Sequence, residues 1–183
     1  MRTTFLFMVT TIDGYYEAPG HDISWHPGSI EFDEFVLEQN STVGTLLFGR
    51  RTYELMAGYW GSDESFSENP PEVVDFMRNT EKVVFSRTLE RADWENTRLV
   101  RDDAAGEVRR LKESGQGDIA IFGSGTLATG LLKDGVIDEL RIMVAPVVLG
   151  AGTSLFAGLG ERRTFELVRT RTFENGAILN VYR

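Results

Sequence analysis

The sequence contains no cysteine and only two histidines, His21 and His26. The absence of cysteine excludes thiol catalysis, disulfide bonds and zinc sites built from thiolates. The two histidines lie in one predicted loop with a single aspartate between them, and this spacing is not diagnostic of a metal site. We therefore expect no bound metal.

Basic residues are also scarce, with 19 Lys and Arg against 28 Asp and Glu and a formal net charge of −9. A polyanion would be repelled at long range, which argues against nucleic acid and anionic membranes as partners. A small phosphorylated ligand is not excluded, because screening limits distant charges to about 8 to 10 Å. No apolar run approaches the length of a membrane span.

What the sequence does contain is an ordinary globular composition, with 42% hydrophobic and 26% charged residues. We expect one domain over residues 1–183, long enough to bury a substantial core. The first residues include one arginine and a short apolar run but no small-residue cleavage site, so they do not resemble a signal peptide. We expect a cytoplasmic protein.

Apolar runs and amphipathic segments alternate as far as Gly135. The apolar runs are typical of buried strands, and the amphipathic segments repeat apolar residues at helical spacing. Two polar stretches, 15–28 and 60–71, are expected to be loops. The predicted strands are 3–11, 45–48, 82–85, 98–100 and 119–122; the predicted helices are 30–40 with Ser29 as N-cap, one with Thr52 as N-cap, one from Asn69-Pro70 through Met77, one capped by Asp102 or Asp103 and ending near Ser114, and one after Gly125.

Beyond Gly135 the pattern predicts strands only. One strand covers 140–148 and is interrupted by Pro146, and a hairpin of 164–173 and 177–182 turns at Asn175-Gly176. The predicted fold class is therefore α/β, with a largely parallel sheet that finishes in antiparallel strands.

Four predicted strands are followed by glycine or arginine groups, at 13–14, 49–51, 86–87 and 123–126. Ligands bind at the carboxyl ends of parallel strands, where these groups are expected to meet. Glycines allow a tight strand-to-helix turn, and the free N–H groups of a helix start attract a phosphate. Each group alone also fits an ordinary turn or a solvated surface, but their coincidence favours an anion site.

Five segments in this order resemble the dihydrofolate reductase-like superfamily: Ile12-Asp13-Gly14, Phe48 to Glu54, Phe85 to Leu89, Phe122 to Gly125 and Pro146 to Gly150. Within it, the chain is most similar to stand-alone relatives of the C-terminal reductase domain of the bifunctional riboflavin-biosynthesis deaminase-reductase. This resemblance covers essentially the whole chain. It implies a three-layer α-β-α fold with about eight strands, NADPH bound across the carboxyl edge of the sheet, and a homodimer formed through the C-terminal strands.

The same resemblance implies roles for individual residues. The pyrophosphate and the adenosine phosphate would meet Gly49, Arg50, Arg51 and Thr52, with Gly123, Ser124, Gly125, Thr126 and Leu127 also at the pyrophosphate. Ser86 and Arg87 would bind the 2′-phosphate, while Val9, Thr10 and Ile12, followed by Gly14 at the turn, would line the nicotinamide end.

The substrate side has three candidate residues, Trp25, Phe32 and Asp33. Asp33 lies 16 residues before Gly49, the interval that separates the pterin-binding acid of dihydrofolate reductases from the equivalent glycine. At the edge of an amphipathic helix it is expected to be either a half-buried catalytic carboxylate or a solvated helix acid. Trp25 and Phe32 either stack on a planar substrate or simply pack.

Together these features predict an NADPH-dependent reductase that transfers hydride to a small heterocyclic substrate, similar to a pterin or pyrimidine, or to a carbonyl or imine. Hydride transfer is the chemistry of the cofactor, so no protein nucleophile is required. The alternative is a nucleotide-binding protein of the same fold without catalytic turnover.

Overall fold

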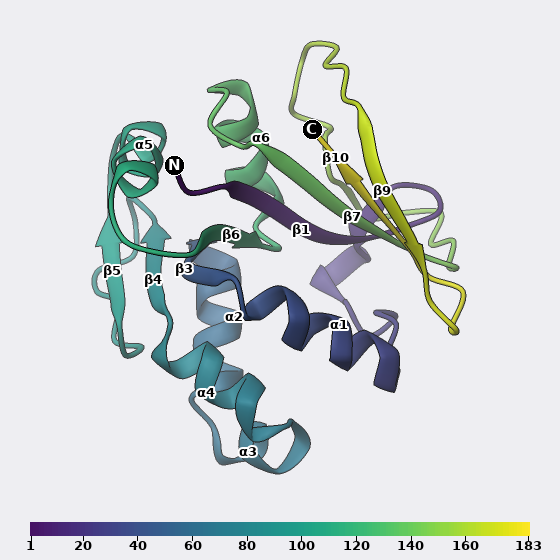
Figure 1. The fold of residues 1–183 in the computed structure, drawn as a ribbon, viewed down its shortest axis with the longest axis horizontal. Coiled ribbons are helices and arrows are strands. Elements are labelled where there is room, and N and C mark those ends of the chain that lie inside the picture. Colours follow the sequence, from purple (N-terminus) through teal and green to yellow (C-terminus); the bar gives the residue numbers. More distant parts are fainter.

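The computed structural model describes residues 1–183 and is organised around a mixed sheet of eight strands (Figure 1). Their order is β5-β4-β3-β6-β1-β7-β10-β9, and neighbours are parallel except that β10 runs antiparallel to β7 and β9. The predicted sheet with antiparallel C-terminal strands is confirmed. The strands are β1 (Thr4–Thr11), β3 (Val43–Gly49), β4 (Glu81–Phe85), β5 (Thr97–Val100), β6 (Asp118–Phe122), β7 (Glu139–Ala145), β9 (Leu167–Thr172) and β10 (Ile178–Tyr182).

Helices cover both faces of this sheet, which confirms the three-layer arrangement (Figure 1). One face carries α1 (Ile30–Asn40), α2 (Arg50–Trp60), α4 (Pro71–Asn79) and the short α3 (Asp63–Glu68), and the other carries α5 (Ala104–Glu113) and α6 (Gly125–Lys133). No helix of the structure is both long and apolar enough to cross a membrane.

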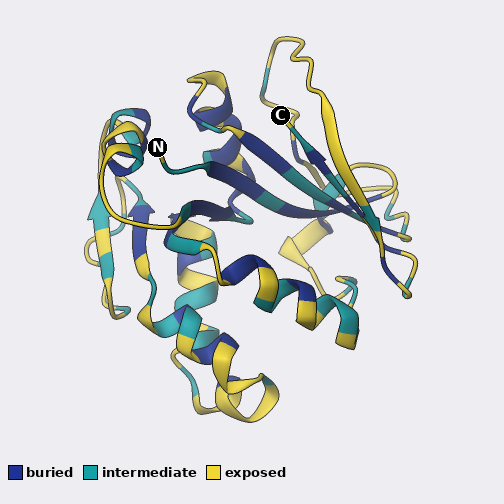
Figure 2. Cartoon of the chain, in the orientation of Figure 1, coloured by how far each residue is buried: buried dark blue, intermediate teal, exposed yellow.

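The central strand β1 supplies core residues to both layers because successive side chains of a strand point to opposite faces. Phe5 and Val9 pack on the side of α1, α2 and α4, whereas Leu6 and Met8 pack on the side of α5 and α6. Almost every residue of β1 is buried, as the continuous apolar run predicted (Figure 2).

Several local predictions were wrong in detail. Thr52 does not cap α2: the helix begins at Arg50, with Gly49 in the N-cap position and no side-chain cap. The predicted loop 60–71 contains α3, and the predicted loop 15–28 contains β2 (Tyr15–Glu17) and a 3-10 turn (Pro19–His21). Strand β2 pairs with β8 (Thr153–Ser154), a contact between distant segments that local sequence patterns do not predict.

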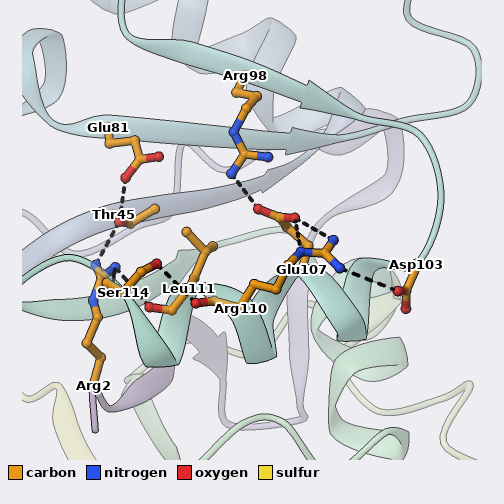
Figure 3. A network of polar contacts seen from close by, with 9 residues as sticks. All are labelled: Arg2, Thr45, Glu81, Arg98, Asp103, Glu107, Arg110, Leu111 and Ser114. Carbon is orange, nitrogen blue, oxygen red and sulfur yellow. Dashed lines mark hydrogen bonds and ion pairs between the residues drawn. The ribbon is translucent and has the colours of Figure 1, made fainter.

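The beginning of the chain is tied to α5 through Arg2 (Figure 3). Its guanidinium donates to the carbonyl oxygens of Leu111 and Ser114 at 3.2 and 2.9 Å, which belong to the last turn and C-cap of that helix. It also donates to Thr45 Oγ1 at 2.7 Å, and Thr45 in turn donates to Glu81. One cation therefore satisfies helix-end carbonyls and joins them to β3 and β4.

A second network holds α5 against β5 (Figure 3). The buried carboxylate of Glu107 accepts hydrogen bonds from Arg98 and from Arg110, the latter at 2.6 Å. Burial by itself raises the pKa of Glu107, but hydrogen bonds from the two guanidinium groups outweigh it and hold the pKa below its usual range.

Lys82 is a fully buried lysine whose ammonium group lies at the C-terminal end of α4. Its Nζ donates to the carbonyl oxygens of Met77, Arg78 and Thr80 at 2.9, 3.0 and 2.7 Å, and it lies 4.5 Å from the centre of the Trp94 ring. Burial lowers the pKa of Lys82 to about 8. The ammonium thus satisfies three carbonyls that the helix leaves without partners.

Replacing Lys82 with methionine is expected to lower the free energy of unfolding by about 2 kcal/mol at pH 7.5, because buried carbonyls lose their donor. Between pH 8 and 10.5 the unfolded chain keeps the lysine proton that the folded protein has lost, so this residue contributes more stability as the pH rises. Urea unfolding at pH 7.5 and 9.5 should show a larger deficit of Lys82→Met at the higher pH. Lys133→Met, which changes an exposed lysine, serves as control, and an equal deficit at both pH values would contradict the assignment.

Candidate active site

A cavity of about 910 Å³ opens at the carboxyl ends of β3, β4 and β6, between these strands and the helices α1, α2 and α4. Most of its lining is apolar, but one end is polar and contains both glycine turns that the sequence singled out. The predicted residues that line it are Val9, Phe32, Gly49, Arg50, Arg51, Thr52, Gly123, Ser124, Gly125, Thr126 and Leu127.

The two glycine turns are hydrogen-bonded directly to each other through Ser124. Its Oγ accepts from the N–H of Gly49 at 3.0 Å, and its own N–H donates to Thr52 Oγ1 at 3.2 Å. Gly123 and Ser124 both adopt positive φ, +62° and +55°, which bends the chain sharply between β6 and α6. The N-termini of α2 and α6 are consequently held together at one wall of the cavity.

Neither of these helices has a side-chain cap at its N-terminus. The N–H groups of a first helical turn have no partner within the helix, and the helix dipole adds partial positive charge. Arg50 and Arg51 extend from the first turn of α2 beside them. The polar end of the cavity therefore has the donors that an anionic group such as a pyrophosphate requires.

Strand β2 covers this polar end. The Tyr16 ring packs so closely on Gly125 that a Cβ atom there would lie 2.7 Å from the ring. Burial, followed by the nearby Glu17 charge, raises the pKa of the Tyr16 hydroxyl. A side chain larger than hydrogen at position 125 would displace this cover.

Arg51 also contacts the segment around β2. It donates to the buried carboxylate of Glu17 at 3.4 Å and contacts the His21 ring, while the other Glu17 oxygen accepts from Thr153 at 2.7 Å. Arg50 pairs with Glu54 of its own helix at 3.2 Å. Both cations that line the cavity therefore have carboxylate partners in the ligand-free protein.

The residues expected at the 2′-phosphate lie outside the cavity lining. Ser86 follows β4, and its Oγ accepts from the N–H groups of Thr88 and Leu89. Arg87 pairs with Asp102 at 3.3 Å, and both side chains are strongly exposed. Since Phe85 lines the cavity, these residues lie just beyond its rim.

Of the residues predicted at the nicotinamide end, Val9 lines the cavity, whereas Thr10, Ile12 and Gly14 do not. Asp13 within the Asp-Gly turn instead accepts from Thr11 Oγ1 and from the N–H groups of Leu149 and Gly150, the last at 2.7 Å. Hydrogen bonds, first from Thr11, hold the pKa of Asp13 below its usual range. Two of the motifs that carry the resemblance are thus in contact.

On the substrate side, Phe32 lines the cavity and lies near Phe35, whereas Asp33 is exposed and outside the lining. Of the two alternatives for Asp33, the structure shows the solvated helix acid and not the half-buried carboxylate, because the residue falls on the solvent side of α1. Trp25 is half buried and also lies outside the cavity lining. The centres of the Trp25 and His26 rings are 4.7 Å apart, in an edge-to-face arrangement. Desolvation lowers the pKa of His26, which does line the cavity.

Sequence reasoning missed Tyr16, Glu17, Gln39 and Asn40, all of which line the cavity. The first two depend on the pairing of β2 with β8, for which the sequence carries no local signal. Gln39 and Asn40 could have been found from helical spacing, because they lie seven and eight residues after Phe32 and so on the same face of α1.

Comparison with known proteins shows the family of the chain and structures that share its fold. The RibD C-terminal domain family matches residues 2–179. The chain belongs to this family. A Bacillus subtilis (strain 168) relative, the uncharacterized protein YyaP, is 30% identical over 183 residues, covering 99% of this chain and 94% of YyaP.

Solved structures share the fold. A putative riboflavin biosynthesis protein from Shewanella sp. PV-4 superposes with a TM-score of 0.76 at 22% identity, covering 98% of this chain and 97% of that one. A second structure, from Thermotoga maritima, is that of a diaminohydroxyphosphoribosylaminopyrimidine deaminase/5-amino-6-(5-phosphoribosylamino)uracil reductase. It superposes with a TM-score of 0.70 at 18% identity, and the match covers all of this chain but 56% of that longer protein. Family membership supports a reductase-like function at a coarse level, and these neighbours show the shared fold.

The contact between Tyr16 and Gly125 predicts that alanine substitutions at two glycines of α6 have opposite effects on stability. Gly125→Ala is expected to destabilise the protein by about 1 to 3 kcal/mol, because the new Cβ overlaps the Tyr16 ring. Gly130→Ala is expected to stabilise it by about 0.5 to 1 kcal/mol, since no atom lies within 4 Å of its Cβ and alanine favours the helix. Urea unfolding measures both, and stabilisation by both variants would show that Tyr16 does not rest on α6.

Proposed function

We propose that this protein is an NADPH-dependent reductase of a small substrate. The observation that supports it is one continuous cavity in which two uncapped helix N-termini and two arginines form a polar end and apolar side chains form the other. A dinucleotide phosphate and a planar acceptor need these two environments side by side. The donor set at the polar end fits a pyrophosphate.

In this proposal the turns at Gly49 and at Gly123 to Gly125 hold the pyrophosphate through backbone N–H groups, with Arg50 and Arg51 as counter-charges. Ser86 and Arg87 hold the 2′-phosphate beyond the rim. Val9 lies against the nicotinamide, while Thr10, Ile12 and Gly14 support the end of β1 from outside the cavity. When bound, the reduced nicotinamide supplies the hydride.

The chain itself would contribute binding, orientation and exclusion of water. Phe7, Phe32 and Val36 form an apolar wall against which a planar acceptor can lie. Binding at the polar end requires Arg51 to exchange Glu17 for a phosphate oxygen, so the segment around β2 would rearrange as the cofactor enters. The proposal gives Asp33 no direct contact with substrate, because its carboxylate is exposed.

Thermal unfolding with NADPH or NADH tests the cofactor. At about 100 times its dissociation constant, NADPH is expected to add roughly 2.7 kcal/mol to the free energy of unfolding. Arg87→Gln should weaken NADPH about tenfold and leave NADH unchanged, because only NADPH carries the 2′-phosphate. Arg109→Gln, which alters an exposed arginine on α5, is the control.

Absence of a shift with either nucleotide would refute the proposal. A shift without NADPH oxidation across carbonyl, imine and dihydropterin acceptors would favour the nucleotide-binding protein without turnover.

We further propose that the protein acts in the cytoplasm as a homodimer joined at the outer end of the sheet. Strand β9 is an edge strand that is exposed along almost its whole length (Figure 2). Leu167 and Val168 on it are 54% and 49% exposed, and Phe165, two residues before Leu167, is exposed as well. An unpaired edge with apolar side chains favours association.

Sedimentation velocity is expected to give about twice the chain mass of 20.5 kDa, and Val168→Lys is expected to reduce it to that of one chain. Phe66→Lys, on the distant helix α3, removes a similarly exposed apolar side chain and should leave the dimer intact. A monomeric unmodified protein would contradict the proposal.

A further inference from the structure

The segment from Tyr15 to His21 occupies the polar end of the cavity in the ligand-free protein. The Glu17 carboxylate, which is 8% exposed, lies 3.4 Å from the Arg51 guanidinium, where the proposed function places a phosphate oxygen. The Tyr16 ring lies on Gly125, at the uncapped N-terminus of α6. One short segment therefore contacts both the cation and the helix N-terminus that would bind the same anion.

Few interactions hold this segment in its place. Strand β2 pairs with β8 through two residues, Tyr15 opposite Ser154 and Glu17 opposite Thr153, and the register is irregular between them. Both residues of β8 are exposed. A two-stranded ribbon of this length is only marginally stable by itself, so it is expected to open more readily than the eight-stranded sheet.

The backbone is suited to bending near both ends of the segment. Gly14 and Gly20 have positive φ, +82° and +78°, and no atom lies within 4 Å of the Cβ position of either. His21 also has a positive φ, +65°, a conformation that residues with a side chain seldom adopt. Its ring contacts Arg51 and lies 3.1 Å from Glu17. Opening of the segment would release His21 from this conformation, and both glycines can change conformation without collision.

Strand β8, in contrast, is anchored to the body of the protein. Leu155, which follows it directly, is 4% exposed and belongs to a core cluster that includes residues of α6. Its carbonyl oxygen accepts from Thr129 Oγ1 of α6 at 3.0 Å. Movement of the segment is therefore expected to separate β2 from β8 and to leave β8 in place.

We propose that the segment Tyr15–His21 is an autoinhibitory lid, and that Glu17 competes with the phosphate groups of the ligand for Arg51. The closed lid neutralises Arg51 and covers the N-terminus of α6. A ligand that carries a pyrophosphate must separate Glu17 from Arg51 and β2 from β8, so the fraction of open protein limits its apparent affinity. This inference rests on the proposed function in placing a phosphate at the polar end of the cavity.

Removal of the competing charge is expected to tighten anion binding. Glu17→Gln keeps the size of the side chain and the acceptor for Thr153 but loses the charge. Inorganic pyrophosphate is therefore expected to bind this variant about fivefold more tightly in calorimetry at fixed ionic strength. Glu54→Gln is the matched control, because it removes the same charge from the exposed pair with Arg50, and it is expected to change the dissociation constant by at most about twofold.

A reversible cross-link tests the movement of the lid directly. The chain has no cysteine, so Tyr15→Cys combined with Ser154→Cys introduces a single pair at opposed positions of β2 and β8. Opposed residues of antiparallel strands have Cα atoms about 4.5 to 5.5 Å apart, a separation that a disulfide spans. Oxidation is expected to weaken the binding of pyrophosphate and of NADPH at least about tenfold. Reduction is expected to restore binding, so the same protein shows that the variant is folded.

Weaker or unchanged pyrophosphate binding by Glu17→Gln, an equal gain in Glu54→Gln, or unchanged binding after oxidation would overturn the inference. So would the absence of pyrophosphate binding by both the unmodified protein and Glu17→Gln, because the lid would then close no anion site. These outcomes are separable from failure of the proposed function, because thermal unfolding measures NADPH binding independently. Tighter pyrophosphate binding by Glu17→Gln, in a protein that neither NADPH nor NADH stabilises, would contradict the proposed function and leave the lid in place.

Discussion

Two hydrogen bonds at Ser124 hold the polar end of the site together. They join the turn after β3 to the turn after β6, so that the N-termini of α2 and α6 face the same space. Neither N-terminus has a side-chain cap, and two arginines lie beside them. Without this link, each turn would be an ordinary strand-to-helix connection. With it, the helix dipoles and free N–H groups converge on one wall of the cavity, as the proposed binding of a pyrophosphate requires.

The ligand-free protein balances the charge of this end with its own groups. Glu17 pairs with Arg51, Glu54 with Arg50, and the Tyr16 ring lies on α6. The ion pair between Arg50 and Glu54 is exposed, and exposed ion pairs contribute little to stability. A phosphate can therefore replace Glu54 as the partner of Arg50 with little loss of stability. The buried Glu17 is different, because separation from Arg51 leaves a carboxylate whose remaining contacts are Thr153 and the His21 ring, at 2.7 and 3.1 Å. Cofactor binding and movement of β2 are therefore expected to be coupled.

The rotation of α1 about its own axis decides which of its residues face the apolar end of the cavity. Phe32, Val36 and Asn40 share one face of α1, while Asp33, one residue away from Phe32, turns about 100° into solvent. The residues of α1 that line the cavity include no carboxylate.

The sequence by itself determined the order of the strands of the main sheet and of the longer helices, the antiparallel ending and the glycine turns, because periodicity, turn residues and apolar runs are local properties. It also brought Gly49, Arg51 and Ser124 to one cavity, since the carboxyl ends of parallel strands meet at one edge. It did not decide how Ser124 links two helices, that β2 pairs with β8, or that Asp33 faces solvent while Asn40 faces the cavity. Those features depend on contacts between distant segments and on the rotation of a packed helix, which only the tertiary structure decided.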